Sequence, residues 1–244
     1  MLTVRMLGKI SIQQGSLSIV LQSRPAQSLL AWLMLTAGEA HRREKLAGIL
    51  WPNARDENAR DYLRHELWRL NRALRPIEAA GLPFLLVNKI SITFNAKAPY
   101  WLDAHQMMLA SAQPAATVED ELTSAFLYQG ELLPGIYDDC VNPHRMRVLS
   151  AFDTLMTRLL RRLREERRYE DAVRAGLHWI MHGELPETAY RELMLAHHGL
   201  HDLAAIRRDM DACRSHLHSQ LGARPSRKTL ELFHRLMTEQ QGAP

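Results

Sequence analysis

Basic side chains recur along residues 60–74, "RDYLRHELWRLNRAL", at spacings that predict one long amphipathic helix. Four leucines recur on a single helical stripe, namely Leu63, Leu67, Leu70 and Leu74. The opposite side carries Arg64, His65, Trp68, Arg72 and, beyond the last turn, Arg75. Guanidinium groups suit phosphate oxygens and the edges of guanine bases. The chemistry that this side of the helix can perform is therefore binding of nucleic acid.

A basic helix side can also be a solvated surface, and two observations favour binding over solvation. Arg64, Arg72 and Arg75 have no acidic residue four positions away, so pairing along the helix should be sparse. Trp68 stands among the arginines, where an exposed indole is costly unless it meets a partner. We expect Trp68 either to contact DNA or to pack against the neighbouring hairpin or a partner subunit.

The sequence "AHHGLH" places His197, His198 and His201 together, which raises the possibility of a zinc site. His197 and His201 would share a helix side, but Gly199 lies between them and is expected to end the helix. The sequence therefore predicts a polar turn between helices and no metal site or cofactor.

Two further clusters contain residue types that suit catalysis or phosphate binding. The stretch "YDDCVNPH" contains Asp138, Asp139, Cys140 and His144, but no oxyanion-stabilising element accompanies this Cys–His pair. No enzymatic activity is predicted. The stretch "HRREK" at 41–45 precedes a helix start, where side chains and backbone amides could hold a phosphate, and a solvated turn is an equal alternative.

The elements that position these side chains follow in a characteristic order. Short apolar runs, "LTVRMLGKISI" and "LSIVL", predict small strands with a turn at Gly15. Three helices follow in "RPAQSLLAWLMLTAGEA", "HRREKLAGILWP" and "DENARDYLRHELWRLNRAL", the first with Pro25 in its first turn. "PFLLV" and "ISITF" then predict a β-hairpin that turns at Asn88 and Lys89. Strands, three helices and a hairpin are the layout of a winged helix, whose third helix enters the major groove and whose hairpin, the wing, runs beside the DNA.

From Tyr100 onward the pattern is almost wholly helical. Proline and glycine separate segments of helical period at 103–112, 117–130, 144–167, 169–182, 187–199, 202–221 and 226–240. Aligning Ala172 with Ala204 or with Ile206 gives a repeat of about 32 or 34 residues, close to the tetratricopeptide period. The predicted fold is mostly α with a small β component, a winged-helix domain at 1–97 followed by a tetratricopeptide-like helical repeat domain at 100–244, with the boundary near 96–103.

The composition agrees with a globular protein of two modest domains. Hydrophobic residues make up 46% and charged residues 24% of the chain, and the formal net charge is +4. No apolar run reaches the roughly 20 residues of a membrane span. The two cysteines, Cys140 and Cys213, lie far apart, which predicts free thiols and a cytoplasmic location. Trp32, Trp51, Trp101 and Trp179 are expected in the core.

The chain resembles the SARP-type bacterial transcriptional activators, in which a response-regulator-like winged helix precedes a bacterial transcriptional activator domain. The resemblance covers about residues 2–237 and rests on "YWLDAHQM", "YQGELLPGIYDD", "RYEDAV", "YRELMLAHHG", "CRSHLHSQLGARPSRKT" and the third helix. It implies a cytoplasmic regulator that binds double-stranded DNA as a homodimer and recruits RNA polymerase. The residues expected to contact DNA are Arg60, Arg64, His65, Trp68, Arg69, Arg72, Arg75, Lys89, Arg42 and Arg43.

The sequence departs from the family pattern in three places. Cys140 follows the "YDD" sequence where tryptophan is common, Asn71-Arg72 replaces a double arginine, and the wing "VNKISITFN" lacks an Arg-Asp or glycine-rich turn. The alternative function is therefore a protein-interaction adaptor with a degenerate winged helix. The chain contains no G-x-x-x-x-G-K-[ST] motif for an ATPase module, so we expect either a small stand-alone member or the front of a larger regulator.

Overall fold

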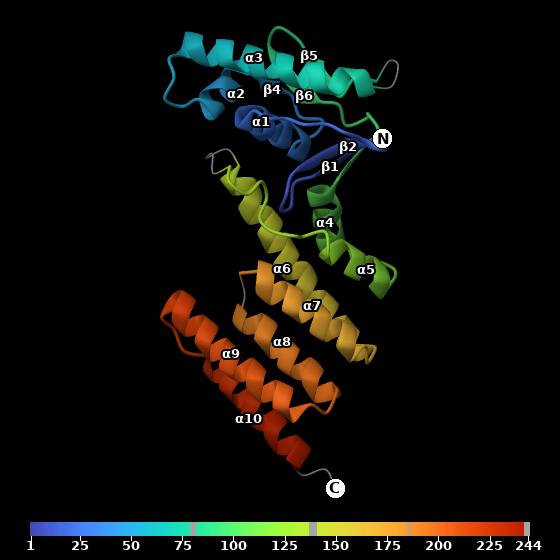
Figure 1. Cartoon of the computed structure of the whole chain (residues 1–244), viewed down its shortest axis with the longest axis vertical. Helices are drawn as coiled ribbons and strands as arrows, with labels where there is room; N and C mark the ends of the chain where they lie inside the picture. Colours follow the sequence, from blue (N-terminus) through green and yellow to red (C-terminus); the bar gives the residue numbers. More distant parts are fainter. Residues whose placement is uncertain (79–81, 137–140, 185, 242–244) are drawn as a thin grey trace. The chain divides into compact units, whose positions relative to one another are not determined.

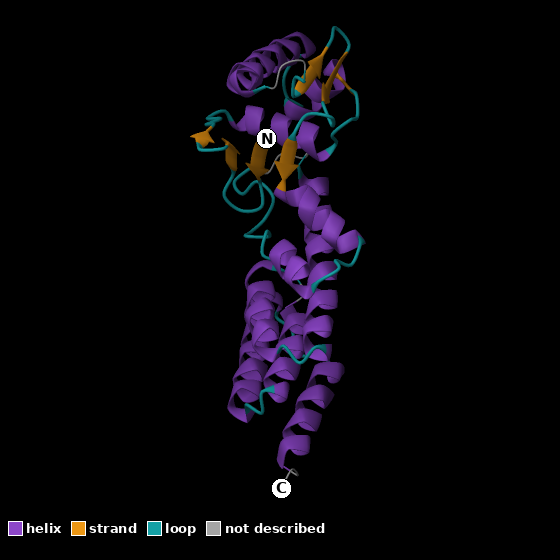
Figure 2. Ribbon diagram, turned by 90° about the vertical axis from the view of Figure 1, so that its right-hand side faces the viewer, coloured by secondary structure: helices purple, strands orange, loops and turns teal. Residues whose placement is uncertain are grey.

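The computed structural model describes residues 1–78, 82–136, 141–184 and 186–241, and Figures 1 and 2 show its elements. The first elements are β1 (Leu2–Arg5), β2 (Ser11–Gln14), β3 (Leu17–Ser18), α1 (Arg24–Leu35), β4 (His41–Arg42), α2 (Arg43–Leu50), α3 (Asp56–Leu74), the 3-10 helix η1 (Arg75–Ile77), β5 (Leu85–Val87), β6 (Ser91–Phe94) and β7 (Tyr100–Leu102). The later elements are α4 (Asp103–Ala112), α5 (Val118–Ala125), α6 (Asn142–Glu165), α7 (Tyr169–His182), α8 (Pro186–Gly199), α9 (Leu203–Leu221) and α10 (Arg227–Gln241). The chain is mostly helical with a small β component, as predicted.

The chain divides into two compact units. Unit 1 combines Met1–Gln106 with Tyr128–Val148, and unit 2 combines Met107–Leu127 with Leu149–Pro244. The strands of the described chain belong to unit 1 (Figure 2). Because Tyr128–Val148 lies within the helical half of the sequence, unit 1 is larger than the winged helix that the sequence pattern outlines.

Unit 1 contains two small sheets. One has the strand order β3-β2-β1-β7 and the other β4-β6-β5. β1 pairs antiparallel with β2 and parallel with β7, with Val4 opposite Ile12 and Leu102. The first apolar run thus holds two strands, and the predicted turn at Gly15 joins β2 to β3. The sequence pattern predicted neither β7 nor β4, since each has only two or three residues and pairs with a distant strand.

Helices α1, α2 and α3 of unit 1 pack against one another. In α1 the side chain of Ser23 accepts a hydrogen bond from the Ala26 N–H, and Pro25 occupies the first turn, where its missing N–H costs nothing. α3 packs on α1 and α2. The leucine stripe of α3 is buried, with Leu63, Leu67, Leu70 and Leu74 at most 4% exposed. The predicted bounds of α3 and the direction of its apolar side are therefore confirmed.

A backbone clasp joins the first sheet to the described part of Tyr128–Val148. Leu7 and Leu132 form an antiparallel bridge. The Gly8 N–H donates to the Glu131 carbonyl at 3.0 Å, and the Leu133 N–H donates to the Met6 carbonyl at 2.9 Å. The motif "GELLPG", which contributed to the family resemblance, thus stabilises unit 1 by joining its two segments through backbone hydrogen bonds.

One arginine holds the far side of this clasp. Arg145 at the start of α6 donates to the carbonyls of Leu132, Leu133 and Ile136, with its shortest such contact at 2.8 Å to Ile136. Asp103, from the motif "YWLDAHQM", stabilises the other side of the same region. Its buried carboxylate accepts the N–H groups of Met6 at 2.8 Å and of Leu7 at 3.0 Å. Burial raises the pKa of Asp103 even though these N–H groups favour the carboxylate.

Replacing Gly8 with alanine should weaken the clasp. Gly8 has a φ of +86°, and a Cβ there would lie 2.9 Å from the Gln129 carbonyl oxygen. We expect Gly8→Ala to lower the free energy of unfolding by about 2–4 kcal/mol, from the left-handed backbone and the steric overlap together. The matched control is Gly15→Ala, because Gly15 also has a positive φ of +58° but open space around it. Urea unfolding of the two variants measures the difference, and equal losses would show that the close approach at Gly8 carries no energy.

Unit 2 is built from helical hairpins (Figure 1). α7 packs on α8, α8 packs on α9, and α10 packs on α8 and α9. The turns before α7 and α9 repeat, because Arg167 and His201 both have left-handed backbones with φ of 56° and 59°. Ala172 and Ile206 are both fully buried, whereas Ala204 is exposed. The structure therefore selects the longer of the two repeat intervals left open by the sequence.

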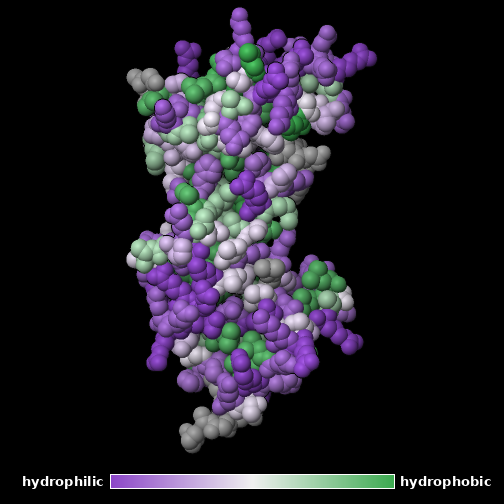
Figure 3. Space-filling view, turned by 180° about the vertical axis from the view of Figure 1, so that it is seen from behind, coloured by the Kyte–Doolittle hydropathy of each residue, from purple (hydrophilic) through white to green (hydrophobic). Residues whose placement is uncertain are grey.

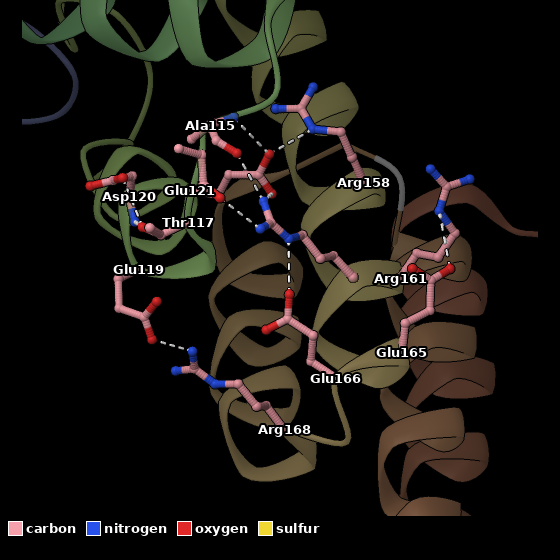
Figure 4. A network of polar contacts seen from close by, with 12 residues as sticks. Ala115, Thr117, Glu119, Asp120, Glu121, Arg158, Arg161, Glu165, Glu166 and Arg168 are labelled. Atoms are coloured by element: carbon pink, nitrogen blue, oxygen red, sulfur yellow. Dashed lines mark hydrogen bonds and ion pairs between the residues drawn. The ribbon is translucent and has the colours of Figure 1, made fainter.

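Two buried polar groups stabilise unit 2 internally. Glu121 of α5 is fully buried and accepts a hydrogen bond from Arg158 Nε at 3.0 Å. Figure 4 shows Arg158 of α6 directed at this carboxylate. Arg162 of the same helix donates to the carbonyls of Ala115 at 3.0 Å and Ala116 at 3.1 Å, in the loop before α5. Of the four tryptophans predicted in the core, Trp179 is fully buried and donates to Asp153 at 2.6 Å. The remaining three, Trp32, Trp51 and Trp101, are only partly buried. Trp51 follows the last residue of α2, and Trp101 belongs to β7 at the edge of its sheet.

Candidate nucleic-acid interface

The side of α3 opposite its leucine stripe faces outward from unit 1. The side chain of Arg64 is 74% exposed and Trp68 is 55% exposed, and Arg72 and Arg75 are exposed as well. Figure 3 shows the other face of unit 1, away from α3, where hydrophilic side chains are mixed with hydrophobic ones. α3 therefore presents basic groups and one indole to solvent, as the sequence pattern predicted.

Trp68 and Arg72 form a pair on this surface. The Arg72 guanidinium carbon lies 5.2 Å from the centre of the Trp68 ring, which is the geometry of a cation–π contact. The His65 ring lies on the same indole at a centroid distance of 6.2 Å. The three side chains that sequence spacing placed together are thus in contact, and the indole restricts the positions that the Arg72 guanidinium can adopt.

Trp68 also lines an open groove beside α3. The groove has a volume of about 630 Å³, and its lining comprises Val20, Leu21, Gln22, Ser23, Ala26, Trp68, Arg69, Arg72 and Ala73. These residues come from α3, the first turn of α1 and the segment before it, and none comes from the hairpin β5–β6. The hairpin thus contributes nothing to this groove, and the partner of Trp68 stays a prediction.

The arginines of α3 have more acidic partners than the sequence pattern suggested. Arg64 pairs with Asp61 at 3.1 Å, a spacing of three residues rather than four, and Arg60 pairs with Glu44 of α2 at 3.4 Å. Both pairs are exposed, and exposed pairs contribute about 0–1 kcal/mol. A phosphate group can therefore compete for these guanidinium groups at small cost.

Arg69 differs from its neighbours. Its Nη1 donates to Glu66 Oε1 at 3.1 Å, and Glu66 is only 8% exposed. The same carboxylate accepts a hydrogen bond from Ser23 Oγ at 2.7 Å. Arg69, which the sequence placed among the DNA contacts, is thus engaged with a largely buried carboxylate that belongs to the packing of α3 on α1.

The hairpin turn gathers the remaining predicted contacts. Arg43 Nη1 donates to the Asn88 carbonyl at 3.3 Å, and Arg42 pairs with Ser91 across β4 and β6. Asn88 Oδ1 accepts the Ile90 N–H at 2.8 Å and closes the turn that exposes Lys89. The structure therefore brings Arg42, Arg43 and Lys89 into one region at the hairpin turn, and Glu44, the residue after Arg43, pairs with Arg60 of α3.

Two features of this region were not apparent from the sequence. His41, the first residue of "HRREK", is buried and lies 2.7 Å from Thr36 Oγ1 through Nε2. Burial lowers the pKa of His41, so it is a neutral packing residue and not a phosphate contact. The hairpin also exposes apolar side chains, with Ile90 67%, Leu86 46% and Val87 42% exposed.

The first turn of α3 adds a residue that the sequence analysis missed. Asn58 is exposed on the same side of α3 as His65 and Arg72, and it lines a groove around the turn from α2 to α3 with Trp51 and Tyr62. Amide side chains pair well with adenine edges. The sequence could have indicated Asn58, because it is a polar amide in the first turn of the predicted helix, ahead of Arg60 and Arg64.

The histidines considered for zinc binding have other partners. His197 Nδ1 lies 2.6 Å from Asp209 Oδ2, and His198 Nε2 lies 3.5 Å from Glu239. α8 ends at Gly199 as predicted, and His201 follows it in the next turn. Within residues 1–78, 82–136, 141–184 and 186–241 no group of three potential metal ligands was found.

The structure describes only part of the stretch "YDDCVNPH" that contains Cys140. Asp138, Asp139 and Cys140 lie outside the described residues, and His144 packs edge-on against Trp32 at a ring distance of 5.3 Å. Burial lowers the pKa of His144, with a contribution from Arg147. Cys213 is buried, and burial raises the pKa of its thiol to about 11, so this thiol stays protonated at neutral pH.

Charge is distributed unevenly along the chain. The net charge of +4 originates in unit 1, because acidic residues slightly outnumber basic ones in unit 2. A search of the described helices for one that is long and apolar enough to span a bilayer found none. The basic excess thus coincides with the unit that carries α3 and the hairpin.

Comparisons with known proteins agree with this architecture. The bacterial transcriptional activator domain family matches residues 102–237. A solved structure described as Mycobacterium tuberculosis EmbR in complex with a low affinity phosphopeptide is similar, with a TM-score of 0.72 and 14% sequence identity. The match covers 98% of this chain but 65% of that one, so this chain spans slightly less than two thirds of the length of that protein. At this identity the likeness concerns the fold, a winged helix followed by a helical repeat domain. No curated protein sequence matches the chain.

Proposed function

The chain belongs to the bacterial transcriptional activator domain family, and from this premise we propose that it binds specific DNA sequences through α3 and activates transcription from them. The observation that carries the proposal is the outward side of α3. Arg64, Trp68 and Arg72 are exposed there, while the leucines of the same helix are buried. A helix held in this way can enter the major groove with its basic side toward the bases.

The contacts divide into two classes by position. Asn58 and Arg64 lie toward the helix N-terminus, the end that usually reaches base edges, so they are proposed to read sequence. Arg72 and Arg75 lie toward the other end and are proposed to hold phosphates. Arg42, Arg43 and Lys89 at the hairpin turn are proposed to contact the backbone beside the groove.

The remaining parts of the proposal concern partners. Unit 2 has no net positive charge and consists of stacked helical hairpins, an architecture that offers an extended surface for proteins. We assign to it the recruitment of RNA polymerase and the pairing of two chains on DNA. The proposed location is the bacterial cytoplasm.

A salt titration of duplex binding tests the proposal. Wild-type protein should bind a duplex selected from a random library, and log K should fall linearly with log salt with a slope of about −0.9 per phosphate contact. A slope near −3 to −6 is expected if α3 and the hairpin turn both engage the backbone. Affinity that is absent, or that does not depend on salt, would contradict the proposal.

A second candidate function is a protein-interaction adaptor. The exposed apolar side chains of the hairpin, Leu86, Val87 and Ile90, favour it, because a wing that runs along DNA gains little from them. The same titration separates the two functions, since an adaptor with a degenerate winged helix would show no selected duplex.

A further inference from the structure

Glu66 stands at the boundary between the buried and the outward sides of α3. It is 8% exposed, and its neighbours on the helix, Leu63, Leu67 and Leu70, are buried. Its Oε2 accepts a hydrogen bond from Ser23 Oγ at 2.7 Å. Ser23 is the residue that caps α1, so a single hydroxyl connects the start of α1 with the middle of α3.

The other carboxylate oxygen of Glu66 is engaged from the next turn of α3. Arg69 Nη1 lies 3.1 Å from Oε1, and His65 Nδ1 lies 3.8 Å from it. The hydrogen bond from Arg69 helps to keep the carboxylate turned toward Ser23. Because the hydroxyl of Ser23 also accepts the Ala26 N–H at 3.4 Å, its position is fixed by the backbone of α1.

The leucine stripe alone does not determine the angle of α3 about its axis. Hydrophobic attraction is non-directional, so a modest rotation exchanges one set of apolar contacts for another. A hydrogen bond to a charged group is directional and weakens steeply when its angle changes. With a side-chain radius of about 5–6 Å, a rotation of about 20° would move the outward side chains by ~2 Å. Such a displacement removes hydrogen bonds to base edges, whereas long basic side chains can still reach phosphates.

We infer that Glu66 and Ser23 are positioning residues that set the angle of α3 and thereby determine how well the protein discriminates between DNA sequences. The inference rests on the proposed function. Neither residue has to touch DNA, because both act through the orientation of Arg64, Trp68 and Arg72. Loss of their contact should therefore lower discrimination and leave the sequence-independent affinity for phosphates unchanged.

The test uses the full chain and reverses the polarity of the contact. Ser23→Asp keeps a favourable capping residue at the start of α1 but sets a carboxylate against that of Glu66. Adding Glu66→Gln supplies an amide that can donate to the introduced carboxylate. Ser23→Thr keeps both the cap and the original hydrogen bond. Affinities for the duplex selected by wild type and for a scrambled duplex give the discrimination ratio of each variant.

We expect Ser23→Asp to lower this ratio roughly ten-fold, the equivalent of about one base contact. The double variant should recover most of it, and Ser23→Thr should match wild type. The salt slope on the scrambled duplex should stay constant throughout. The matched control is Thr117→Asp, because Thr117 caps α5 of unit 2 and its hydroxyl also faces an acidic side chain, Asp120, at 2.7 Å. This control should lower the melting temperature without changing the ratio.

Each outcome decides the inference. Wild-type discrimination in Ser23→Asp, or equal impairment of the single and double variants, would overturn it. If Ser23→Asp melts below the assay temperature, Glu66→Met carries the comparison, since it keeps a side chain of similar length but removes the acceptor of the Ser23 hydroxyl, and an unchanged ratio would overturn the inference. Failure of wild type to discriminate between duplexes would overturn the proposed function as well, whereas discriminating wild type with unaffected variants overturns the inference alone.

Discussion

Replacing Arg158 with alanine is expected to lower the free energy of unfolding by about 3–5 kcal/mol, because it leaves a fully buried carboxylate without its principal partner. Arg158 Nε lies 3.0 Å from Glu121 Oε1, and Glu121 is completely buried. Arg162, whose Nη1 is 3.9 Å from the other oxygen of Glu121, is too distant to compensate. The same replacement removes donors from two carbonyl groups, those of Ala110 and Ser111.

The matched control lies nearby on the same helix. Arg161 is 66% exposed and approaches Glu165 at only 3.9 Å, and Figure 4 shows both residues. Arg161→Ala removes the same type of side chain as Arg158→Ala, but at a solvent-exposed position. It should change the free energy of unfolding by about 0.5 kcal/mol or less. Urea unfolding of both variants measures the difference. Similar losses at the two positions would show that the buried pair of α5 and α6 contributes no more than a surface pair.

The sequence pattern predicted those elements that show a local period. α3 was predicted with its observed bounds, since four leucines and a charged first turn mark it without reference to the rest of the chain. The helices of unit 2 were predicted within a few residues for the same reason, apart from α5, which ends at Ala125 and not at 130. Local periodicity was sufficient wherever an element buries one continuous apolar side.

Elements that depend on distant partners were not predictable in this way. β7 consists of "YWL" and exists because it lies beside β1, nearly a hundred residues earlier in the chain. The clasp at Gly8 and Leu132 likewise depends on a close backbone approach that no pattern in either segment reveals. For this reason the sequence did not indicate that Tyr128–Val148 belongs to unit 1.

The candidate interface was predictable in its side chains but not in their partners. The outward direction of Arg64 and Arg72 follows from the leucine stripe and is observed. The engagement of Arg69 with Glu66 was missed, because it depends on the contact of Glu66 with Ser23 of another helix. The proximity of Arg43 to the hairpin turn was missed because it depends on the unexpected strand β4.

Replacing Arg64 and Arg72 together with alanine should damage DNA binding while leaving the fold intact. Both residues lie opposite the buried leucines, so neither change opens a cavity, and each should alter stability by about 0.5 kcal/mol or less. Loss of a base contact at Arg64 should cost about 1–3 kcal/mol and relax specificity at one position. Loss of a phosphate contact at Arg72 should weaken all sequences alike and reduce the salt slope by about one.

Leu67→Ala provides the opposite control on the same helix. Leu67 is 4% exposed, and its truncation should lower the free energy of unfolding by about 2–5 kcal/mol through a core cavity. At a temperature where this variant remains folded, its discrimination between duplexes should exceed that of the double arginine variant. The comparison separates loss of contact from loss of structure.

The most direct measurement is therefore the affinity of wild type and of the Arg64→Ala, Arg72→Ala double variant for the selected and the scrambled duplex, with thermal melts of both proteins. The account predicts equal melting temperatures, weaker binding of both duplexes by the variant, and a larger loss on the selected duplex. A variant that melts like wild type and binds each duplex as tightly as wild type does would contradict the assignment of this side of α3 to DNA.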